Sequence, residues 1–419
     1  MTGWEPDPAE LRRVREKSRD VVKETPVFSF GALSRRCGGQ VFLKAENLQR
    51  TGSFKLRGTA AKLRADPAAA ARGVVAGSAG NHGQALAYAA RARGIPCTIF
   101  MPVEAAVSKV EAVAAFGAEV RSEGTSVDDA VAAARRLAAE EGLLFVHPFD
   151  DLDIVKGQAG VGLEIAAQVP DVARVVVPVG GGGLVSGVAA ALKSERPEVE
   201  IVGVQATGCA SLRTSLAEGR PEAVAAPSTI ADGIAVKRPG ELTFALMERW
   251  LDDLAEVDDD AIAAAMVFLA ERAKLVTEGA GAVAVAALAT GAIAPARSGA
   301  TVAILSGGNV DADVLAGAIN RALTGVGRRV RFFTRIRDRP GSLAALLEQV
   351  AGAGGNVLDV THVRDGVSLH VDETGVELLV ECRGVAAGRR LLAEMRGAGY
   401  PVEELNRAEA DRAETDRSA

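Results

Sequence analysis

Short runs of β-branched residues alternate with alanine-rich stretches along most of the chain, from Gln40 to about Asn320. Each apolar run is followed by turn residues and then by a stretch of helical composition. Parallel strands need a long crossover, which a helix usually supplies, so this alternation predicts an α/β fold with parallel sheets covered by helices. Strands are expected at Ile95–Met101, Leu143–Val146, Val175–Val179, Ile201–Val204 and Val302–Leu305.

A different pattern begins after Thr324. A chain of 419 residues is too long for one ordinary core, so two or three domains are expected. Residues 1–324 form the first domain, 325–329 a linker and 330–406 a second domain, and the charged residues 407–419 are expected to be disordered. The second domain has the ferredoxin-like order βαββαβ. Its elements are expected at Val330–Arg337, Ser342–Ala353, Asn356–Val363, Glu377–Glu381, Ala386–Ala398 and Val402–Leu405.

The charge pattern gives no reason to expect a nucleic-acid or membrane partner. The formal net charge is -6, which does not favour binding to phosphate backbones or anionic lipid. The basic run Arg328–Arg339 alternates with apolar residues, as a strand with one solvated face does. The uncharged stretch Gly279–Ala296 consists mainly of alanine and glycine, which indicates a buried helix rather than a membrane span.

The cysteines and the first residues suggest a cytoplasmic location. The first segment, Met1–Asp20, is rich in charge and lacks the apolar core of a signal peptide. The cysteines form neither a CxxC pair nor a disulfide-like framework, which fits a reducing compartment. They are Cys37, Cys97, Cys209 and Cys382.

Four consecutive glycines, Gly180–Gly183, lie between the expected strand Val175–Val179 and an expected helix, Leu184–Lys193. Glycines let several backbone N–H groups converge on an anion, and a helix N-terminus adds partial positive charge, so a phosphate is the expected ligand. Neither the Walker pattern nor the G-x-G-x-x-G spacing is present, which weakens a nucleotide-binding interpretation. The alternative is a tight strand-to-helix turn, although four glycines cost more chain entropy than a plain turn requires.

A second polar turn, Ser78–Gly83, follows the expected strand Gly73–Ala76 and opens an expected helix, Gln84–Arg93. A hydroxyl, an amide side chain and backbone N–H groups at a helix N-terminus together suit a carboxylate. The alternative is that Ser78 or Asn81 serves only as a helix cap.

Two further residues complete the pattern. Lys55 lies in the segment Ser53–Gly58, and a lone lysine is usually a solvated surface charge. Ser306 follows the strand Thr301–Leu305, at the carboxyl end where open α/β sheets bind ligands.

The four motifs together resemble those of the tryptophan-synthase-β-like enzymes, the second fold type of pyridoxal-phosphate (PLP) enzymes. Within that group the chain is similar to threonine ammonia-lyases (threonine dehydratases) and serine racemases, over roughly Glu16–Asn320. The resemblance implies PLP as cofactor, a small amino acid as substrate and a catalytic region of two parallel-sheet α/β subdomains. The smaller subdomain, at about 45–150, would be inserted in the larger one.

The resemblance also implies a role for each motif. Lys55 would hold PLP as a Schiff base and act as the catalytic base, with Phe54 packed against the ring. Asn81 would bond the phenolic oxygen, and Ser306 would meet the pyridine nitrogen. The phosphate would be cradled by Gly180, Gly181, Gly182, Gly183 and Leu184. The substrate carboxylate would be bound by Ser78, Gly80, Asn81 and His82, and positioning roles would fall to Asp232, Gly233 and Glu278.

The implied reaction removes the β-hydroxyl of L-threonine and gives 2-oxobutanoate and ammonia; L-serine would give pyruvate. Serine racemases carry a second serine where this chain has Ala79, and alanine has no exchangeable proton, which favours dehydration over racemisation. They also bind a divalent cation through acidic residues, and Gln205–Ser211 has none, so no metal is expected as a tight Mg²⁺ or Ca²⁺ site; a weak or monovalent ion bound by carbonyls is the alternative. The alternatives are a serine racemase or serine dehydratase, and a non-catalytic amino-acid-binding regulator.

The second domain resembles an ACT regulatory domain, on the segment Arg337–Leu343 between its first strand and helix. This resemblance implies an effector pocket at Asp338 and Gly341, usually formed where two such domains pair, for an amino acid such as isoleucine, valine or serine. A homodimer or homotetramer is expected from the resemblance and from the general prevalence of symmetric oligomers.

Overall fold

A computed structural model describes residues 3–364 and 369–405. The chain divides into two compact units, Met1–Ala318 and Ile319–Ala419. The division falls within helix α14 (Ala312–Gly325), and strand β11 (Arg329–Arg337) follows after residues 326–328. The helix thus continues past Thr324, where the sequence predicts the first domain to end. The expected disordered tail, 407–419, lies outside the described residues.

The larger sheet of unit 1 has six strands in the order β1-β2-β10-β7-β8-β9. All neighbouring pairs are parallel except β1 and β2 at one edge. The connections between the parallel strands pass through helices, as the alternating sequence predicts. The strands are β1 (Val27–Ser29), β2 (Val41–Ala45), β7 (Val172–Pro178), β8 (Glu200–Ala206), β9 (Asp253–Val257) and β10 (Ala300–Leu305).

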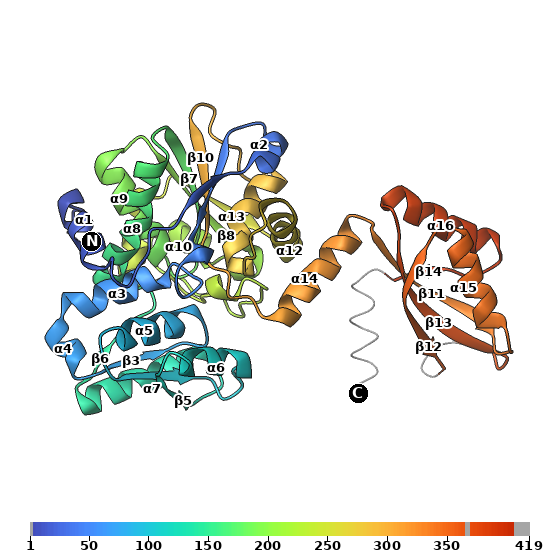
Figure 1. The fold of residues 1–419 in the computed structure, drawn as a ribbon, viewed down its shortest axis with the longest axis horizontal. Coiled ribbons are helices and arrows are strands. Elements are labelled where there is room, and N and C mark those ends of the chain that lie inside the picture. Colours follow the sequence, from blue (N-terminus) through green and yellow to red (C-terminus); the bar gives the residue numbers. More distant parts are fainter. Residues whose placement is uncertain (1–2, 365–368, 406–419) are drawn as a thin grey trace. The chain divides into compact units, whose positions relative to one another are not determined.

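A second, wholly parallel sheet of four strands lies between β2 and β7 in the chain, in the order β5-β4-β3-β6. Figure 1 shows it at the lower left with helices α5, α6 and α7. The prediction of two parallel-sheet α/β subdomains is confirmed. Its strands are β3 (Val74–Gly77), β4 (Cys97–Met101), β5 (Glu119–Ser122) and β6 (Leu144–Phe145). Its helices are α5 (Asn81–Arg91), α6 (Val107–Ala114) and α7 (Val127–Glu141).

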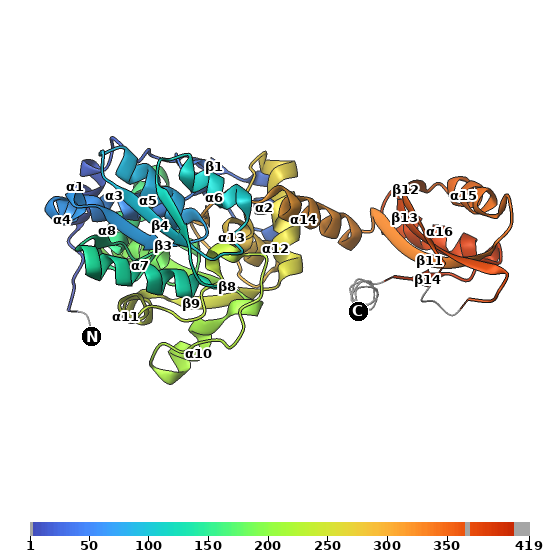
Figure 2. The same ribbon diagram turned by 90° about the horizontal axis from the view of Figure 1, so that it is seen from below.

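Helices cover both faces of the larger sheet (Figures 1 and 2). Successive residues of β7 belong to different cores, with Val176 on one face and Val175 and Val177 on the other, as the two-residue period of a strand requires. The first core includes α2 (Gly31–Cys37), α12 (Asp259–Phe268) and α13 (Gly279–Thr290), and the second includes α8 (Leu152–Gln168), α9 (Gly183–Glu195) and α11 (Glu241–Trp250). The other helices are α1 (Pro8–Lys17), α3 (Lys55–Ala65), α4 (Pro67–Ala71) and α10 (Ser211–Glu218).

Helix α13 accounts for the uncharged stretch in the sequence. Every residue from Gly279 to Leu288 is buried, so the small residues allow close packing on all sides. Among the described residues, no helix is both long enough and apolar enough to cross a membrane.

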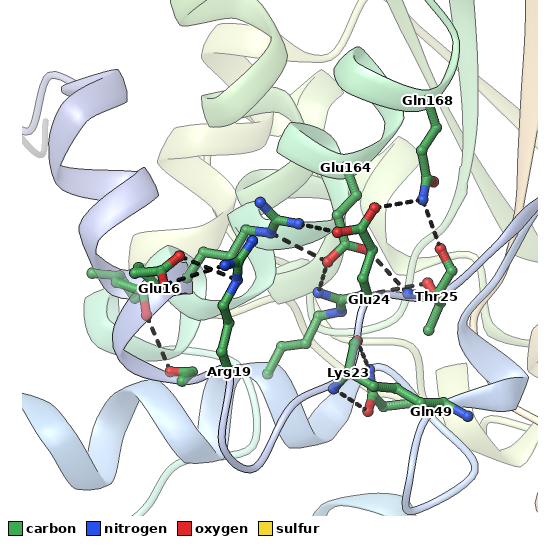
Figure 3. A network of polar contacts seen from close by, with 12 residues as sticks. Glu16, Arg19, Lys23, Glu24, Thr25, Gln49, Glu164 and Gln168 are labelled. Carbon is green, nitrogen blue, oxygen red and sulfur yellow. Dashed lines mark hydrogen bonds and ion pairs between the residues drawn. The ribbon is translucent and has the colours of Figure 1, made fainter.

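A network of buried charges joins α3 to α8. Arg57 of α3 donates to Glu46 (Nε–Oε2 2.7 Å) and to Glu164 of α8 (Nη1–Oε1 2.8 Å). Lys44 Nζ donates to Glu164 Oε2 at 2.6 Å. None of these four side chains is more than 2% exposed. Thr25 also takes part in this network, because its N–H donates to Glu164 Oε2 at 3.3 Å (Figure 3). Two cations face two carboxylates, which is how buried charge is tolerated.

Unit 2 is built as β11-α15-β12-β13-α16-β14, the predicted βαββαβ order. The strands form one antiparallel sheet in the order β12-β13-β11-β14. In β11, Val330, Phe332 and Ile336 enter the core, whereas Arg331 pairs with Glu377 outside it. The predicted apolar face is confirmed, but the face predicted to be solvated is so only in part, because Phe333 on it is buried. The remaining elements are α15 (Ser342–Gly352), β12 (Asn356–Val363), β13 (Glu373–Glu381), α16 (Val385–Gly397) and β14 (Glu403–Glu404).

Candidate active site

Lys55 lies where two segments of unit 1 that are far apart in the sequence meet. It is the first residue of α3, and the N–H of the preceding Phe54 donates to the carbonyl oxygen of Ser306 (N–O 3.1 Å). Ser53 forms an antiparallel bridge with Gly307. These backbone contacts fix the start of α3 against the carboxyl end of β10, so the structure brings Lys55 and Ser306 together.

The Lys55 side chain is half-buried, and its amine forms no ion pair with any described residue. Its Nζ donates to the carbonyl oxygen of Pro148 at 2.9 Å and lies 5.2 Å from the centre of the Phe54 ring. Desolvation lowers the pKa of Lys55 to about 8, although the negative charge of Glu278 acts in the opposite direction. A lysine with a lowered pKa supplies neutral, nucleophilic amine near neutral pH.

The glycine turn leaves buried backbone donors without acceptors. Gly183 is already the first residue of α9, one residue earlier than the sequence predicts, and α9 has no side-chain cap. Residues 181–184 are buried, and among the described residues no acceptor lies within hydrogen-bonding distance of their N–H groups. Buried N–H groups without partners are costly. Together with the helix N-terminus they suit an anionic ligand such as a phosphate.

The same glycines are also required by packing. A Cβ added at Gly181 would lie 2.4 Å from the Phe149 ring, and one at Gly182 would lie 2.7 Å from Met247 Cε. Gly182 also has a φ of 93°, which favours glycine. Packing within the turn therefore explains the glycines by itself, and the expectation of a phosphate depends on the unpaired N–H groups.

The polar turn Ser78–Gly83 leads directly into α5, which begins at Asn81 rather than at Gln84. Ser78 Oγ accepts hydrogen bonds from the N–H groups of Gly80 and Gly83, both at 3.2 Å. Ser78 thus closes the turn, as the capping alternative requires. The N–H groups of Asn81 and His82 have no acceptor in the described part of the chain, so the start of α5 can still receive a carboxylate.

The side chain of Asn81 does not cap the helix. Its Nδ2 donates to both carboxyl oxygens of Glu278, at 2.8 and 3.0 Å, and its Oδ1 accepts from Asn309 Nδ2 at 2.7 Å. Glu278 is 4% exposed. Desolvation, with a smaller contribution from Asp232, raises the pKa of Glu278 to about 8.

His82 is a neutral, fully enclosed ring. Its Nε2 lies 2.9 Å from the carbonyl oxygen of Val146, which can only accept, so Nε2 carries the proton. Desolvation, with a smaller contribution from the charge of Lys55, lowers the pKa of His82 to about 3. The imidazole therefore brings no positive charge to a substrate carboxylate.

Ser306 is 3% exposed, and its hydroxyl donates to the carbonyl oxygen of Ala280 at 3.2 Å. The two residues predicted to bind an effector belong to unit 2. Gly341 precedes α15 with a φ of 90°, and Asp338 pairs with Arg364 at 3.0 Å. The described residues contain no cluster of His, Cys, Asp or Glu that could hold a metal ion.

Sequence reasoning missed two residues that shape the site. Asn309 was visible at the end of the Ser-Gly-Gly-Asn turn, but nothing in the pattern indicated that it contacts Asn81. Phe149 packs against Gly181 and Gly183, and its place after His147-Pro148 gave no signal of that contact.

The donor set fits pyridoxal phosphate: a half-buried amine of lowered pKa, a turn of unpaired N–H groups and a serine at a strand end. A family model described as "Pyridoxal-phosphate dependent enzyme" matches residues 19–307. The chain therefore belongs to the pyridoxal-phosphate dependent enzymes, and PLP is its cofactor.

The chain is also similar to individual proteins whose names are more specific than that of the family. An L-threonine ammonia-lyase of Thermotoga maritima is 45% identical over 373 residues, covering 89% of this chain and 92% of the relative. The processed form of threonine deaminase isoform 2 from Solanum lycopersicum has a TM-score of 0.71 and 36% identity, covering 77% of this chain and 90% of the other. A maize serine racemase has a TM-score of 0.72 and 33% identity, covering 77% and 99%.

Proposed function

We propose that this protein is an ammonia-lyase that converts L-threonine to 2-oxobutanoate and ammonia, and that also converts L-serine to pyruvate. The observation that carries the proposal is the half-buried Lys55 at the start of α3, held against the carboxyl end of β10, with its pKa lowered to about 8. The name of the Thermotoga maritima relative and that of the tomato structure support threonine as the substrate.

In this proposal the PLP is held by residues that the fold brings together around Lys55. Lys55 would hold the cofactor covalently through its amine, and Phe54 would pack against the ring. Asn81 would bond the phenolic oxygen and Ser306 the pyridine nitrogen. The phosphate would be bound by the unpaired N–H groups of the turn Gly180–Leu184.

The substrate carboxylate binds at the start of α5. The donors there are the main-chain N–H groups of Asn81 and His82, helped by the positive end of the helix. Ser78 Oγ accepts from the N–H groups of Gly80 and Gly83 and so shapes the turn, while its own O–H remains available to donate to the carboxylate. Since His82 is neutral, binding at this position depends on backbone donors rather than on a side-chain charge.

Lys55 is also the base of the reaction. When bound, PLP withdraws electrons from the substrate and so acidifies its α-proton. Lys55 would be the group placed to take that proton, and its lowered pKa favours the neutral form that can accept it. Because Ser306 is uncharged, it would not hold the pyridine nitrogen protonated as a carboxylate would, which fits elimination of the β-hydroxyl as water.

Serine racemisation is the second candidate, favoured by the similarity to the maize serine racemase. Ala79 argues against it, since a methyl group cannot return a proton to the α-carbon. A non-catalytic amino-acid-binding regulator would not need Lys55 with a lowered pKa or a glycine turn whose N–H groups are unpaired.

The test is incubation of purified protein with PLP and L-threonine, followed by detection of 2-oxobutanoate. Lys55→Ala should lower turnover by at least about 100-fold, as loss of an acid-base group does. With L-serine, pyruvate should exceed D-serine. A wild-type protein that takes up no PLP, or that forms mainly D-serine, would contradict the proposal.

Unit 2 is proposed to be an ACT domain that binds an amino-acid effector, such as isoleucine, valine or serine, at the turn of Asp338 and Gly341. Its βαββαβ order supports this assignment. The working assembly is proposed to be a homodimer or homotetramer. A cytoplasmic location is proposed because the four cysteines are free thiols.

A further inference from the structure

Asn81 is held by one residue on each side, and both come from the larger subdomain. Glu278 precedes α13, Asn309 follows β10, and Asn81 begins α5 of the smaller subdomain. Asn309 Nδ2 also donates to the carbonyl oxygen of Thr51 at 2.8 Å. The four groups form one chain of hydrogen bonds, from Thr51 through Asn309 and Asn81 to Glu278.

The direction of this chain is fixed at the Thr51 end. A backbone carbonyl can only accept, so Asn309 must turn its NH₂ group toward Thr51. The same Nδ2 also faces the Asn81 side chain, so Asn81 must accept this hydrogen bond through its Oδ1. Consequently Asn81 Nδ2 points to Glu278, and this holds whether Glu278 is ionised or protonated, because either form offers an accepting oxygen.

One hydrogen of Asn81 Nδ2 remains available. The two oxygens of a single carboxyl group lie too close together to take both hydrogens of an NH₂ group, which diverge widely. Glu278 therefore shares one hydrogen between its oxygens. The described residues provide no other acceptor for Asn81 Nδ2, so its second N–H is free for a ligand.

We propose that Asn309 and Glu278 are positioning residues that lock the Asn81 amide with an N–H, rather than its carbonyl, directed at the phenolic oxygen of the cofactor. This inference rests on the proposed function, in which Asn81 contacts that oxygen. An N–H donor stabilises the ionised phenolate, whereas a carbonyl in its place would favour the protonated phenol.

The test is a substitution that should reverse the orientation of the Asn81 amide. Asn309→Asp replaces the donor by an acceptor of nearly the same shape, which repels Asn81 Oδ1 and favours the flipped amide. The bound PLP should then shift from the long-wavelength absorbance of the ionised imine to the shorter-wavelength absorbance of the phenol form. PLP affinity should fall about tenfold, the effect of one hydrogen bond.

The double variant Asn309→Asp/Glu278→Gln separates positioning from simple structural damage. The amide introduced by Glu278→Gln can donate to the flipped carbonyl of Asn81, so the melting temperature should recover relative to Asn309→Asp. The absorbance should stay shifted, because the flipped amide is now held in place. Parallel recovery of stability and absorbance would overturn the proposal.

Asn47→Asp is the matched control. Asn47 is 9% exposed and donates to the carbonyl oxygen of Val276 at 2.9 Å, but it does not contact Asn81. It should keep the wild-type absorbance ratio. A wild-type ratio in Asn309→Asp at saturating PLP would refute the positioning role alone, whereas a wild-type protein without imine absorbance would refute the proposed function.

Discussion

Lys55 and Glu278 are shifted toward their neutral forms by the same cause. Desolvation lowers the pKa of Lys55 to about 8 and raises the pKa of Glu278 to about 8. Each charge partly stabilises the other, but no direct hydrogen bond joins them in the described residues. A buried site that holds its amine near the neutral state is prepared for attack on an aldehyde.

The lowered pKa of Lys55 predicts the pH dependence of cofactor uptake. With a pKa of about 8, roughly one tenth of the amine is neutral at pH 7, compared with about one part in 2,500 at the ordinary value. The rate of imine formation in protein freed of PLP should rise with pH and level off above about pH 8. Stopped-flow absorbance would measure it, with Lys55→Ala as the blank. A rate that still increases at pH 10 would show that the pKa of Lys55 has the ordinary value of a lysine.

Gly181 offers a second test at this scale. An alanine Cβ there would lie 2.4 Å from the Phe149 ring, so the turn must shift and its N–H groups lose their common direction. Gly181→Ala should weaken PLP binding by about tenfold or more, measured by absorbance titration. Gly317→Ala is the matched control, because a Cβ there meets nothing within 4 Å. Equal affinities for the two variants would mean that the turn does not bind the phosphate.

At the scale of elements, the position of Lys55 depends on how α3 is anchored. Arg57, one turn into the helix, joins Glu46 and Glu164. Lys62 near its other end pairs with Asp151 (2.7 Å) and Asp153 (3.0 Å) at the start of α8. Ion pairs thus fix helix α3 at two places along its length. They also fix the position of Lys55, its first residue.

Arg57→Met should be strongly destabilising, because it leaves the carboxylates of Glu46 and Glu164 buried with too few cations. The free energy of unfolding should fall by about 3–5 kcal/mol, as for other broken buried pairs. The control is Arg213→Met, which breaks a pair with Glu256 whose arginine is 60% exposed and should cost less than about 1 kcal/mol. Denaturant unfolding measures both. Similar losses in the two variants would argue against a special role for the buried network.

For the molecule as a whole, the sequence predicted those features that depend on short stretches of neighbouring residues. The order of strands and helices and the glycine turn follow from short patterns, and they agree with the structure. The strands named from the sequence did not include β1, β2, β5 or β9. Of these, the edge strands β1, β5 and β9 are short and half-exposed, so their apolar pattern is weak. The contacts of Asn309 and Phe149 could not be predicted, since they join segments whose meeting depends on tertiary packing.

The division into two units predicts that chemistry and regulation can be separated. All residues proposed to bind PLP or substrate belong to unit 1, whereas Asp338 and Gly341 belong to unit 2. A chain ending at Gly325, which keeps the whole of α14, should therefore retain L-threonine turnover. In the full chain, isoleucine, valine or serine should change the apparent affinity for threonine by about 5- to 150-fold, the usual range of allosteric coupling. The truncated chain should not respond, because the proposed effector site is gone.

Steady-state kinetics of both chains with each amino acid provide the measurement. An effector response that survives truncation would place regulation in unit 1, and an inactive but folded truncated chain would show that unit 2 is needed for catalysis.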